Sequence, residues 1–186
     1  MNQINMSRDI PIQDIETINL IKNEYRRKKN YRELLFFLLA INTGLKTNEI
    51  LNLNVKDVKH KNYIIVEHCL SKTTKRVPLN EEIQEIINIL IKDKPDSYPL
   101  FTSQKGNRLN RISAYNLFKA TCETLGLDKR FSISSLRKTF GYHYYQKYKD
   151  LSFLQWMFNQ NMITQTMKYI GINEDMNFRY RKDFSL

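Results

Sequence analysis

The sequence contains few cysteines, histidines, glycines and prolines for its length of 186 residues, with Cys 2, His 3, Gly 5 and Pro 4. Its two cysteines, Cys69 and Cys122, are too few for the disulfide framework of a small secreted domain. No group of cysteines and histidines has the spacing of metal ligands, so we expect no metal site. Hydrophobic residues at 41% and charged residues at 26% exclude a disordered or low-complexity chain.

Long hydrophobic runs are also absent. The longest apolar stretch, residues 34–41, is far shorter than the roughly 20 residues that cross a bilayer. Residues 1–12 are polar and do not look like a secretory signal. We therefore expect a cytoplasmic protein that has no membrane partner.

Acidic residues are outnumbered by basic ones. The chain has 30 Lys and Arg against 19 Asp and Glu, which gives a formal net charge of +11. A positive excess of this size favours a polyanionic partner, and nucleic acid before a membrane. The length fits one domain, which we expect over residues 1–186, with its core at about 10–170 and a polar tail at 171–186.

Apolar residues recur at helical spacing through most of the chain. They predict helices over residues 12–29, 31–42, 47–53, 80–93, 112–125, 133–148, 151–159 and 163–170. Two β-branched runs, residues 62–66 and 75–79, flank the polar residues 71–74 and predict two antiparallel strands joined by a turn. The expected fold class is therefore mostly α with a small antiparallel β-sheet (α+β).

Four short stretches then occur in a recognisable order. They read TGLKTNEI at 43–50, SKTTKRVPL at 71–79, SSLRKTFGY at 134–142 and TMKYIG at 166–171. Together they resemble the catalytic domain of the tyrosine recombinases, the phage integrase family, over roughly residues 10–175. The resemblance is closest to short stand-alone integrase-like proteins of Gram-positive bacteria, so we expect no separate N-terminal core-binding domain.

The resemblance implies a chemistry in which a tyrosine oxygen attacks a DNA phosphodiester. Such a reaction requires cationic donors on the non-bridging oxygens and a proton for the departing 5′-oxygen, and it requires no metal or cofactor. By position in the family pattern, Tyr169 is the nucleophile, Arg137 is the second phosphate-clamping arginine and Lys72 is the general acid. The implied partner is double-stranded DNA, with no small-molecule substrate.

Three positions depart from the family pattern. The first clamping arginine is replaced by Lys46, the histidine three residues before the second arginine by Ser134, and the later histidine or tryptophan by Gln160. If lysine loses one charge-assisted hydrogen bond of roughly 1.5–3 kcal/mol, the reaction slows about 10- to 150-fold. A missing imidazole base typically costs about 10²- to 10⁴-fold. Because residues that act as a unit are not additive, a slow enzyme and an inactive one both stay open.

Several cations near these stretches are candidates for contacts to DNA phosphates. They are Lys75, Arg76, Lys105, Arg108, Arg111 and Lys138. Binding through such residues would be salt-sensitive and of low sequence selectivity. The alternative is that they form solvated faces, as charge runs usually do.

The candidate residues have structural interpretations too. Tyr169 can be a packing residue, Lys72 an ordinary turn residue and Ser134 the N-terminal cap of the following helix. The aromatic residues between 142 and 156 can stack on bases, but their helical spacing favours core packing.

The sequence thus leaves three functional hypotheses. The first is a DNA strand transferase of the tyrosine recombinase type, acting in integration and recombination with a partly degenerate site. The second is a catalytically impaired DNA-binding relative that occupies recombination sites or modulates an active recombinase. The third is a basic helical protein that contacts RNA or another protein. The resemblance also implies that copies assemble as dimers or tetramers on DNA, with the segment after Tyr169 packed on a neighbour.

Overall fold

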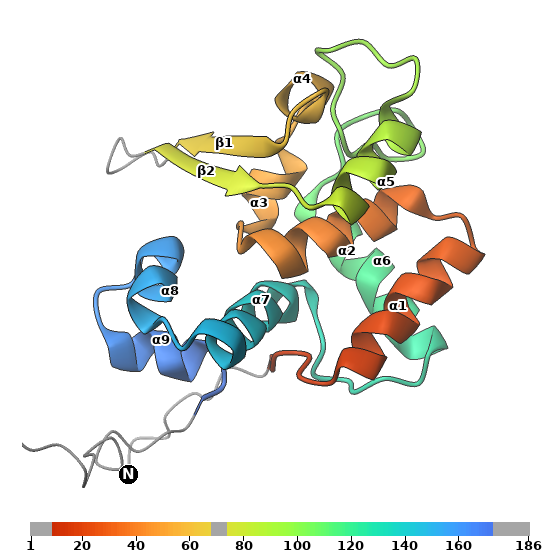
Figure 1. Cartoon of the computed structure of the whole chain (residues 1–186). Coiled ribbons are helices and arrows are strands. Elements are labelled where there is room, and N and C mark those ends of the chain that lie inside the picture. Colours follow the sequence, from red (N-terminus) through yellow and green to blue (C-terminus); the bar gives the residue numbers. More distant parts are fainter. Residues whose placement is uncertain (1–8, 68–73, 173–186) are drawn as a thin grey trace, which may run out of the picture.

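The computed structural model describes residues 9–67 and 74–172 (Figure 1). The predicted general acid Lys72 and most of the predicted tail, residues 173–186, lie outside the described residues. Within the described ranges, no helix is long and apolar enough to cross a membrane. No group of three or more potential metal ligands occurs in them either.

Two N-terminal helices begin the fold: α1 (Ile15–Arg27) and α2 (Tyr31–Thr43). The first starts later than the predicted residue 12, because the Asp14 carboxylate caps it by accepting from the N–H groups of Glu16 and Thr17. The preceding residues instead run along a later helix. There the Ile12 N–H donates to the Thr139 hydroxyl at 2.8 Å, and His143 Nε2 lies 2.9 Å from the Ile12 carbonyl oxygen.

Helix α2 lies at the centre of the core. Its residues from Leu34 to Ala40 are all buried, as expected for a run that is apolar on every face. It packs against α1 on one side and against two helices that come later in the sequence, α5 and α7. The helix ends at Gly44, which has a positive φ of 65°.

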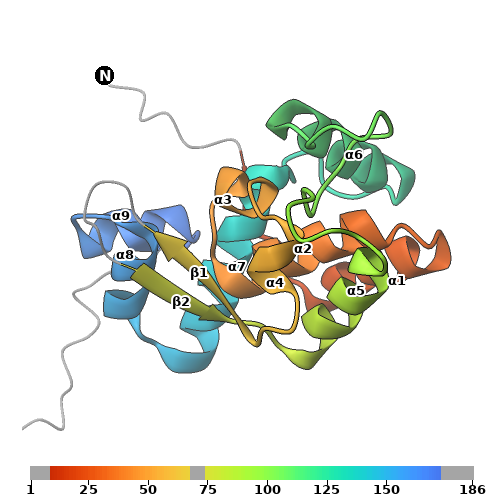
Figure 2. The same cartoon turned by 90° about the horizontal axis from the view of Figure 1, so that it is seen from above.

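The middle of the chain forms two short helices, a hairpin and a longer helix. Their bounds are α3 (Thr47–Leu51), α4 (Val55–Val58), β1 (Tyr63–Glu67), β2 (Thr74–Pro78) and α5 (Glu81–Ile91). The strands are antiparallel, with Ile64 opposite Val77 and Val66 opposite Lys75. Helix α4 was not predicted from the sequence, since a helix of four residues has too few positions to show a period. Figures 1 and 2 show that the end of β1 and the start of β2 lie near α8.

The last part of the described chain is helical throughout. It contains α6 (Arg111–Thr124), α7 (Ile133–Tyr148), α8 (Leu151–Phe158) and α9 (Ile163–Tyr169). Gly141 of α7 lets α9 approach closely, because a Cβ there would lie 2.5 Å from Ile170 and 2.8 Å from Phe158. The predicted fold class is confirmed: the described residues are mostly helical, with one two-stranded antiparallel sheet.

Candidate active site

Arg137 holds a central place between elements far apart in the sequence. From α7, its Nε donates to the Gly44 carbonyl at 2.7 Å and its Nη2 to the Met157 carbonyl at 3.3 Å. Its guanidinium carbon also lies 4.6 Å from the centre of the Phe158 ring. The side chain therefore bridges the end of α2 and the end of α8.

The junction of α2 and α3 meets α7 through Gly44. A Cβ at this glycine would lie 2.6 Å from the Phe140 ring, so a larger residue would push α7 away. The positive φ adds a second reason for glycine at this position. Two of the stretches that the sequence analysis singled out, 43–50 and 134–142, are thus packed together.

A small hollow opens beside Arg137. Its lining includes Lys46, Glu49, Lys75, Met157 and Asn159. The Glu49 carboxylate accepts from the backbone N–H of Lys46 at 2.6 Å and begins α3 in this way. The ion pairs among the described residues lie elsewhere and include none of the three cations of this hollow. Three cationic side chains around one hollow suit an anionic ligand such as a phosphate.

Lys75 reaches this hollow from β2, and its side chain is only 8% exposed. Its ammonium donates to the carbonyls of Trp156 at 3.1 Å and Met157 at 2.9 Å. Burial lowers the pKa of the Lys75 ammonium; Glu49 raises it, while Arg137 and Lys46 lower it. The DNA contact of Lys75 therefore stays a prediction, and in the free protein its charged group is occupied by two backbone carbonyls.

Tyr169 is the last residue of α9 and is half-buried. Its ring packs edge-on against Phe158, with ring centres 5.1 Å apart. Since Phe158 also contacts the Arg137 guanidinium, this phenylalanine links the predicted nucleophile to the predicted phosphate clamp. The packing interpretation and the nucleophile interpretation of Tyr169 both fit this position.

Lys138, another predicted DNA contact, is held inside the protein. It is 5% exposed, and its ammonium donates to the carbonyl of Asp9 at 2.6 Å. Burial lowers the pKa of the Lys138 ammonium, and Asp9 raises it. The same ammonium lies 5.6 Å from the centre of the Tyr169 ring. Lys138 therefore fastens the N-terminal segment to α7 next to the tyrosine.

Ser134 and Gln160 occupy two of the positions that depart from the family pattern. The N-terminal cap of α7 is Ser132, whose hydroxyl accepts from the Ser134 N–H at 3.1 Å, so the capping interpretation of Ser134 is wrong. Ser134 stands in the first turn of α7, one helical turn before Arg137. Gln160 follows α8, and its buried Oε1 has no hydrogen-bond partner within the part of the chain that the structure describes.

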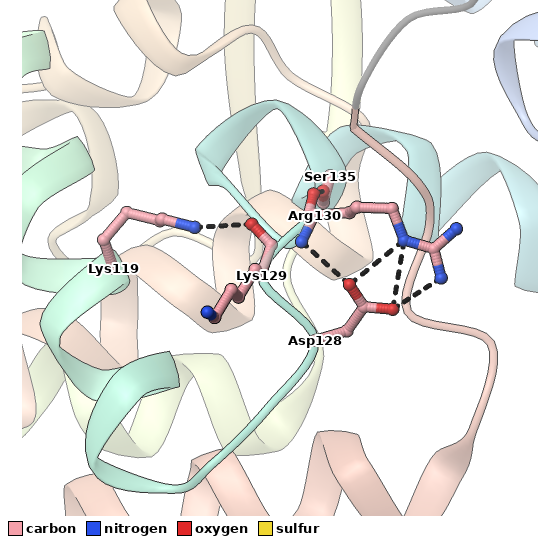
Figure 3. Close-up of polar contacts among 5 residues, drawn as sticks. All are labelled: Lys119, Asp128, Lys129, Arg130 and Ser135. Carbon is pink, nitrogen blue, oxygen red and sulfur yellow. Dashed lines mark hydrogen bonds and ion pairs between the residues drawn. The ribbon is translucent and has the colours of Figure 1, made fainter.

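Polar contacts fix the loop that leads into α7 (Figure 3). Lys119 of α6 donates to the carbonyls of Lys129 at 2.7 Å and Phe131 at 3.1 Å. Asp128 pairs with Arg130 at 2.6 Å, and the hydrogen bonds from Arg130 lower the pKa of Asp128 to about 2. Because this loop precedes the helix that carries Arg137, these contacts help to position the site from outside it.

The remaining predicted DNA contacts lie outside the hollow. Arg76, Lys105 and Arg111 are exposed, as phosphate contacts would be. Arg108 is exposed too, but its guanidinium is engaged: Nη1 donates to the carbonyls of Leu51 at 2.8 Å and Leu53 at 3.1 Å, and Nη2 to the Asn54 side chain. Arg108 therefore has a structural role at the end of α3, which its place in a basic loop did not indicate.

The aromatic residues near the end of α7 are not all core residues. Tyr145 is 2% exposed, but Tyr148 is 56% and Trp156 is 50% exposed. Tyr148 and Trp156, together with Tyr144 and Phe153, line a groove of about 530 Å³ between β2, α7 and α8. The helical spacing that favoured core packing therefore describes Tyr145 and is wrong for Tyr148 and Trp156.

Sequence reasoning missed two residues that organise the site, Lys75 as an internal contact and Phe158. The signal for the first was present, because Lys75 and Val77 share one face of β2, and both are buried while their neighbours are exposed. Phe158 gave no comparable signal. Its contacts with Arg137 and Tyr169 reach two other helices, α7 and α9.

This chain is similar to known proteins in both sequence and fold. It matches the model of the Phage integrase family over residues 10–176. It is 35% identical over 166 residues to the probable integrase/recombinase YoeC of Bacillus subtilis (strain 168), an alignment that covers 89% of this chain and 91% of YoeC. The sequence likeness therefore extends over nearly the whole of both chains.

Two solved structures show the same architecture at low sequence identity. The crystal structure of XerA recombinase has a TM-score of 0.73 at 18% identity and covers 92% of this chain and 65% of XerA. The Tn1549 transposon integrase, in complex with circular intermediate DNA, has a TM-score of 0.72 at 17% identity and covers 95% of this chain and 65% of that one. At these identities the likeness concerns the fold alone. Taken with the family match, it means that the chain belongs to the phage integrase family of tyrosine recombinases.

Proposed function

We propose that this protein is a DNA strand transferase that acts in DNA integration and recombination. The observation that carries the proposal is the place of Arg137, which lines a hollow together with Lys46 and contacts Phe158, the ring that packs against Tyr169. Arg137 and Lys46 form no ion pair within the described residues and provide positive charge for a phosphate diester, while the Glu49 carboxylate in the same hollow offsets part of it. The net charge of +11 and the DNA complex of the Tn1549 integrase support duplex DNA as the ligand.

The proposed reaction is a transesterification. The Tyr169 oxygen forms a bond to phosphorus while the bond from phosphorus to the 5′-oxygen breaks, which leaves a 3′-phosphotyrosyl link and a free 5′-hydroxyl. The Lys72 ammonium supplies the proton of that hydroxyl, and the phenol proton passes to solvent because Ser134 is a poor base. Attack by the 5′-hydroxyl of another strand reverses the step and rejoins the DNA. Atoms and charge balance without a metal, cofactor or small-molecule substrate.

Arg137 and Lys46 would stabilise the negative charge that grows on the non-bridging oxygens. Arg137 is held by two carbonyls and a ring, so little reorganisation is needed when the phosphate arrives. Lys46 supplies a charge but no bidentate fork. A working but slowed site follows from this combination.

A second candidate function is a DNA-binding relative that has lost turnover. The observations that favour it are the substitutions at Lys46, Ser134 and Gln160 and the packing of the half-buried Tyr169 ring against Phe158. Such a protein would keep the basic hollow and occupy recombination sites or modulate an active recombinase.

Covalent trapping on nicked suicide duplexes separates the two functions. The duplexes are made from the DNA that flanks the gene, and adducts are scored on denaturing gels. Three proteins are compared: the unaltered chain, its Tyr169→Phe variant, and a restored variant with Lys46→Arg, Ser134→His and Gln160→His.

An adduct from the unaltered chain that disappears with Tyr169→Phe supports strand transfer. An adduct from the restored variant alone supports the second candidate, because the DNA is then known to be a substrate. Binding to RNA as strong as that to duplex DNA, at several salt concentrations, would contradict both.

We also propose that copies of the chain associate on DNA as dimers or tetramers. The groove next to Trp156 and Tyr148 leaves large aromatic side chains open to solvent, which suits a protein contact. The occupant we favour is the segment after Tyr169 from a second copy, because residues 173–186 include Phe178, Tyr180, Phe184 and Leu186. Mass measurements on DNA should show dissociation to monomers when Trp156→Ser is introduced or when residues 173–186 are removed.

A further inference from the structure

The two cations nearest the end of α8 share a carbonyl. Met157 accepts from the Lys75 ammonium at 2.9 Å and from Arg137 Nη2 at 3.3 Å. Lys75 also binds the Trp156 carbonyl at 3.1 Å and lies 4.7 Å from the centre of the Trp156 ring. One helix end therefore holds a residue of β2 and a residue of α7 side by side.

The end of a helix is a suitable place for this arrangement. The last carbonyls of a helix have no partner within the helix and carry its partial negative charge. In α8 the Asn159 N–H satisfies the Trp156 carbonyl from within the chain, and the two cations supply the additional donors. Because Lys75 is only 8% exposed, we expect water to be a poor replacement for its hydrogen bonds to these carbonyls when the side chain is removed.

Lys75 is also close in sequence to the predicted general acid. It comes three residues after Lys72, at the start of β2, and its partner in the register of the hairpin is Val66. The hydrogen bonds between β1 and β2 hold the strands to each other, but they do not place the start of β2 relative to Arg137. Among the described residues of β2, Lys75 supplies the hydrogen bonds that reach α8.

We propose that Lys75 is a positioning residue: it fastens the hairpin that carries Lys72 to the end of α8, beside Arg137. Lys72 then delivers its proton to the departing 5′-oxygen of the phosphodiester that Arg137 binds. This role rests on the proposed function for its catalytic consequence, but the fastening itself is a property of the free protein. Lys75 does not need to touch the DNA.

The first arm of the test measures fastening without any reaction. Hydrogen exchange of the backbone amides is compared in the unaltered chain, in Lys75→Met and in the milder variant Lys75→Gln, which keeps a donor. We expect the amides of β1 and β2 to exchange about tenfold faster in Lys75→Met and less so in Lys75→Gln. Protection in α2 should not change, which would show that Lys75→Met still folds.

Lys119 offers a matched control, because its ammonium also donates to two carbonyls, that of Phe131 and that of Lys129, the second of which Figure 3 shows. Lys119→Met should speed exchange in the loop before α7 and leave the hairpin protected. If Lys119→Met loosens the hairpin as much as Lys75→Met does, the effect is a general loss of stability and the proposal is overturned.

The second arm of the test changes the leaving group of the reaction. A duplex whose 5′-bridging oxygen is replaced by sulfur needs no general acid, since a thiol is far more acidic than an alcohol. With the ordinary duplex we expect Lys75→Met to form the Tyr169 adduct about 10²-fold more slowly. With the sulfur duplex its rate should return to within about threefold of the unaltered chain, as it should for Lys72→Ala.

The outcomes separate this proposal from the proposed function. Faster exchange in the hairpin together with rescue by sulfur supports it. Unchanged exchange overturns it, and so does an equal loss of rate on both duplexes, which would mean that Lys75 acts through Arg137. If the unaltered chain forms no adduct on DNA that the restored variant cleaves, strand transfer fails as a function while the exchange measurements still decide whether Lys75 fastens the hairpin.

Discussion

Two basic regions of this protein differ in what their cations face. In the hollow beside α7, Lys46, Lys75 and Arg137 come from three separate elements and converge on one space. In the loop that leads to α6, Lys105 and Arg111 point into solvent, and Arg108 turns back to the carbonyls at the end of α3. The two regions look alike in composition and differ in geometry.

The difference teaches that a hydrogen-bonded arginine is not by itself a sign of function or of structure. Arg108 and Arg137 both donate to two carbonyls, but Arg137 also lines a hollow with other cations and contacts Phe158, which packs against Tyr169. Convergence of charge on one space is what an anionic ligand requires. We therefore expect substitutions in the two regions to impair different properties of the protein.

The largest effect should come from replacing Arg137 with alanine, and Arg108→Ala serves as the comparison. Arg137→Ala removes a positioned donor from the phosphate, and we expect adduct formation to fall about 10²- to 10³-fold. Arg108→Ala should reduce the free energy of unfolding by about 1 kcal/mol through loss of its carbonyl contacts, with little change in the rate. Trapping assays and urea denaturation measure the two quantities. Equal loss of rate in both variants would remove the distinction between the regions.

The sequence predicts those parts of the fold whose determining residues lie close together in the chain. The centre of the fold was predictable, because α2 is apolar on all sides and ends at a glycine, both of which are visible in one short stretch. The start of α1 was not, because the apolar spacing that includes Ile12 reflects packing against α7 and the cap at Asp14 decides where the helix begins.

In the candidate site, too, local motifs were predictable from the sequence and contacts between distant residues were not. The resemblance pointed to Arg137 and Tyr169 by motif, and the structure connects them through Phe158. The partners of Lys75 lie 81 and 82 residues away in the sequence, so its charge suggested solvent while its place on the inward face of β2 suggested the interior. Nothing in the basic loop itself showed that Arg108 would fold back onto α3.

A second prediction tests whether the position of α9 depends on its close packing against α7 at Gly141. Gly141→Ala places a methyl group 2.5 Å from Ile170 and should reduce the free energy of unfolding by about 1–3 kcal/mol. Gly126→Ala is the control, since a Cβ there meets nothing within 4 Å and only the cost of its positive φ, about 1–2 kcal/mol, remains. Hydrogen exchange should show loosening of α9 in the first variant and not in the second. If α9 stays protected in Gly141→Ala, the tyrosine helix is held by other contacts.

A third prediction concerns the exposed cations of the basic loop. If Lys105 and Arg111 contact phosphates, replacing either with alanine should lower the slope of log affinity against log salt by about 1. Affinity should fall only a few-fold, and equally for all duplex sequences. Fluorescence anisotropy at several salt concentrations measures both. Unchanged slopes would make this loop a solvated face and leave the hollow as the better supported of the two anion sites.

The smallest effect should appear in acid, at the loop that leads into α7. Hydrogen bonds from Arg130 lower the pKa of Asp128 from an ordinary value near 4 to about 2, so the stabilisation from this pair is complete above pH 4 and is lost as the pH falls from about 4 to about 2. The unfolded chain takes up the proton first, which is why stability decreases in that window. Asp128→Asn and Arg130→Met should each flatten this part of the curve of unfolding free energy against pH, and the variants should converge with the unaltered chain near pH 2. Because the pair is exposed, the change should be small and should shrink further in high salt, unlike a loss in the hollow. A curve that keeps its slope in both variants would assign the acid sensitivity to other carboxylates.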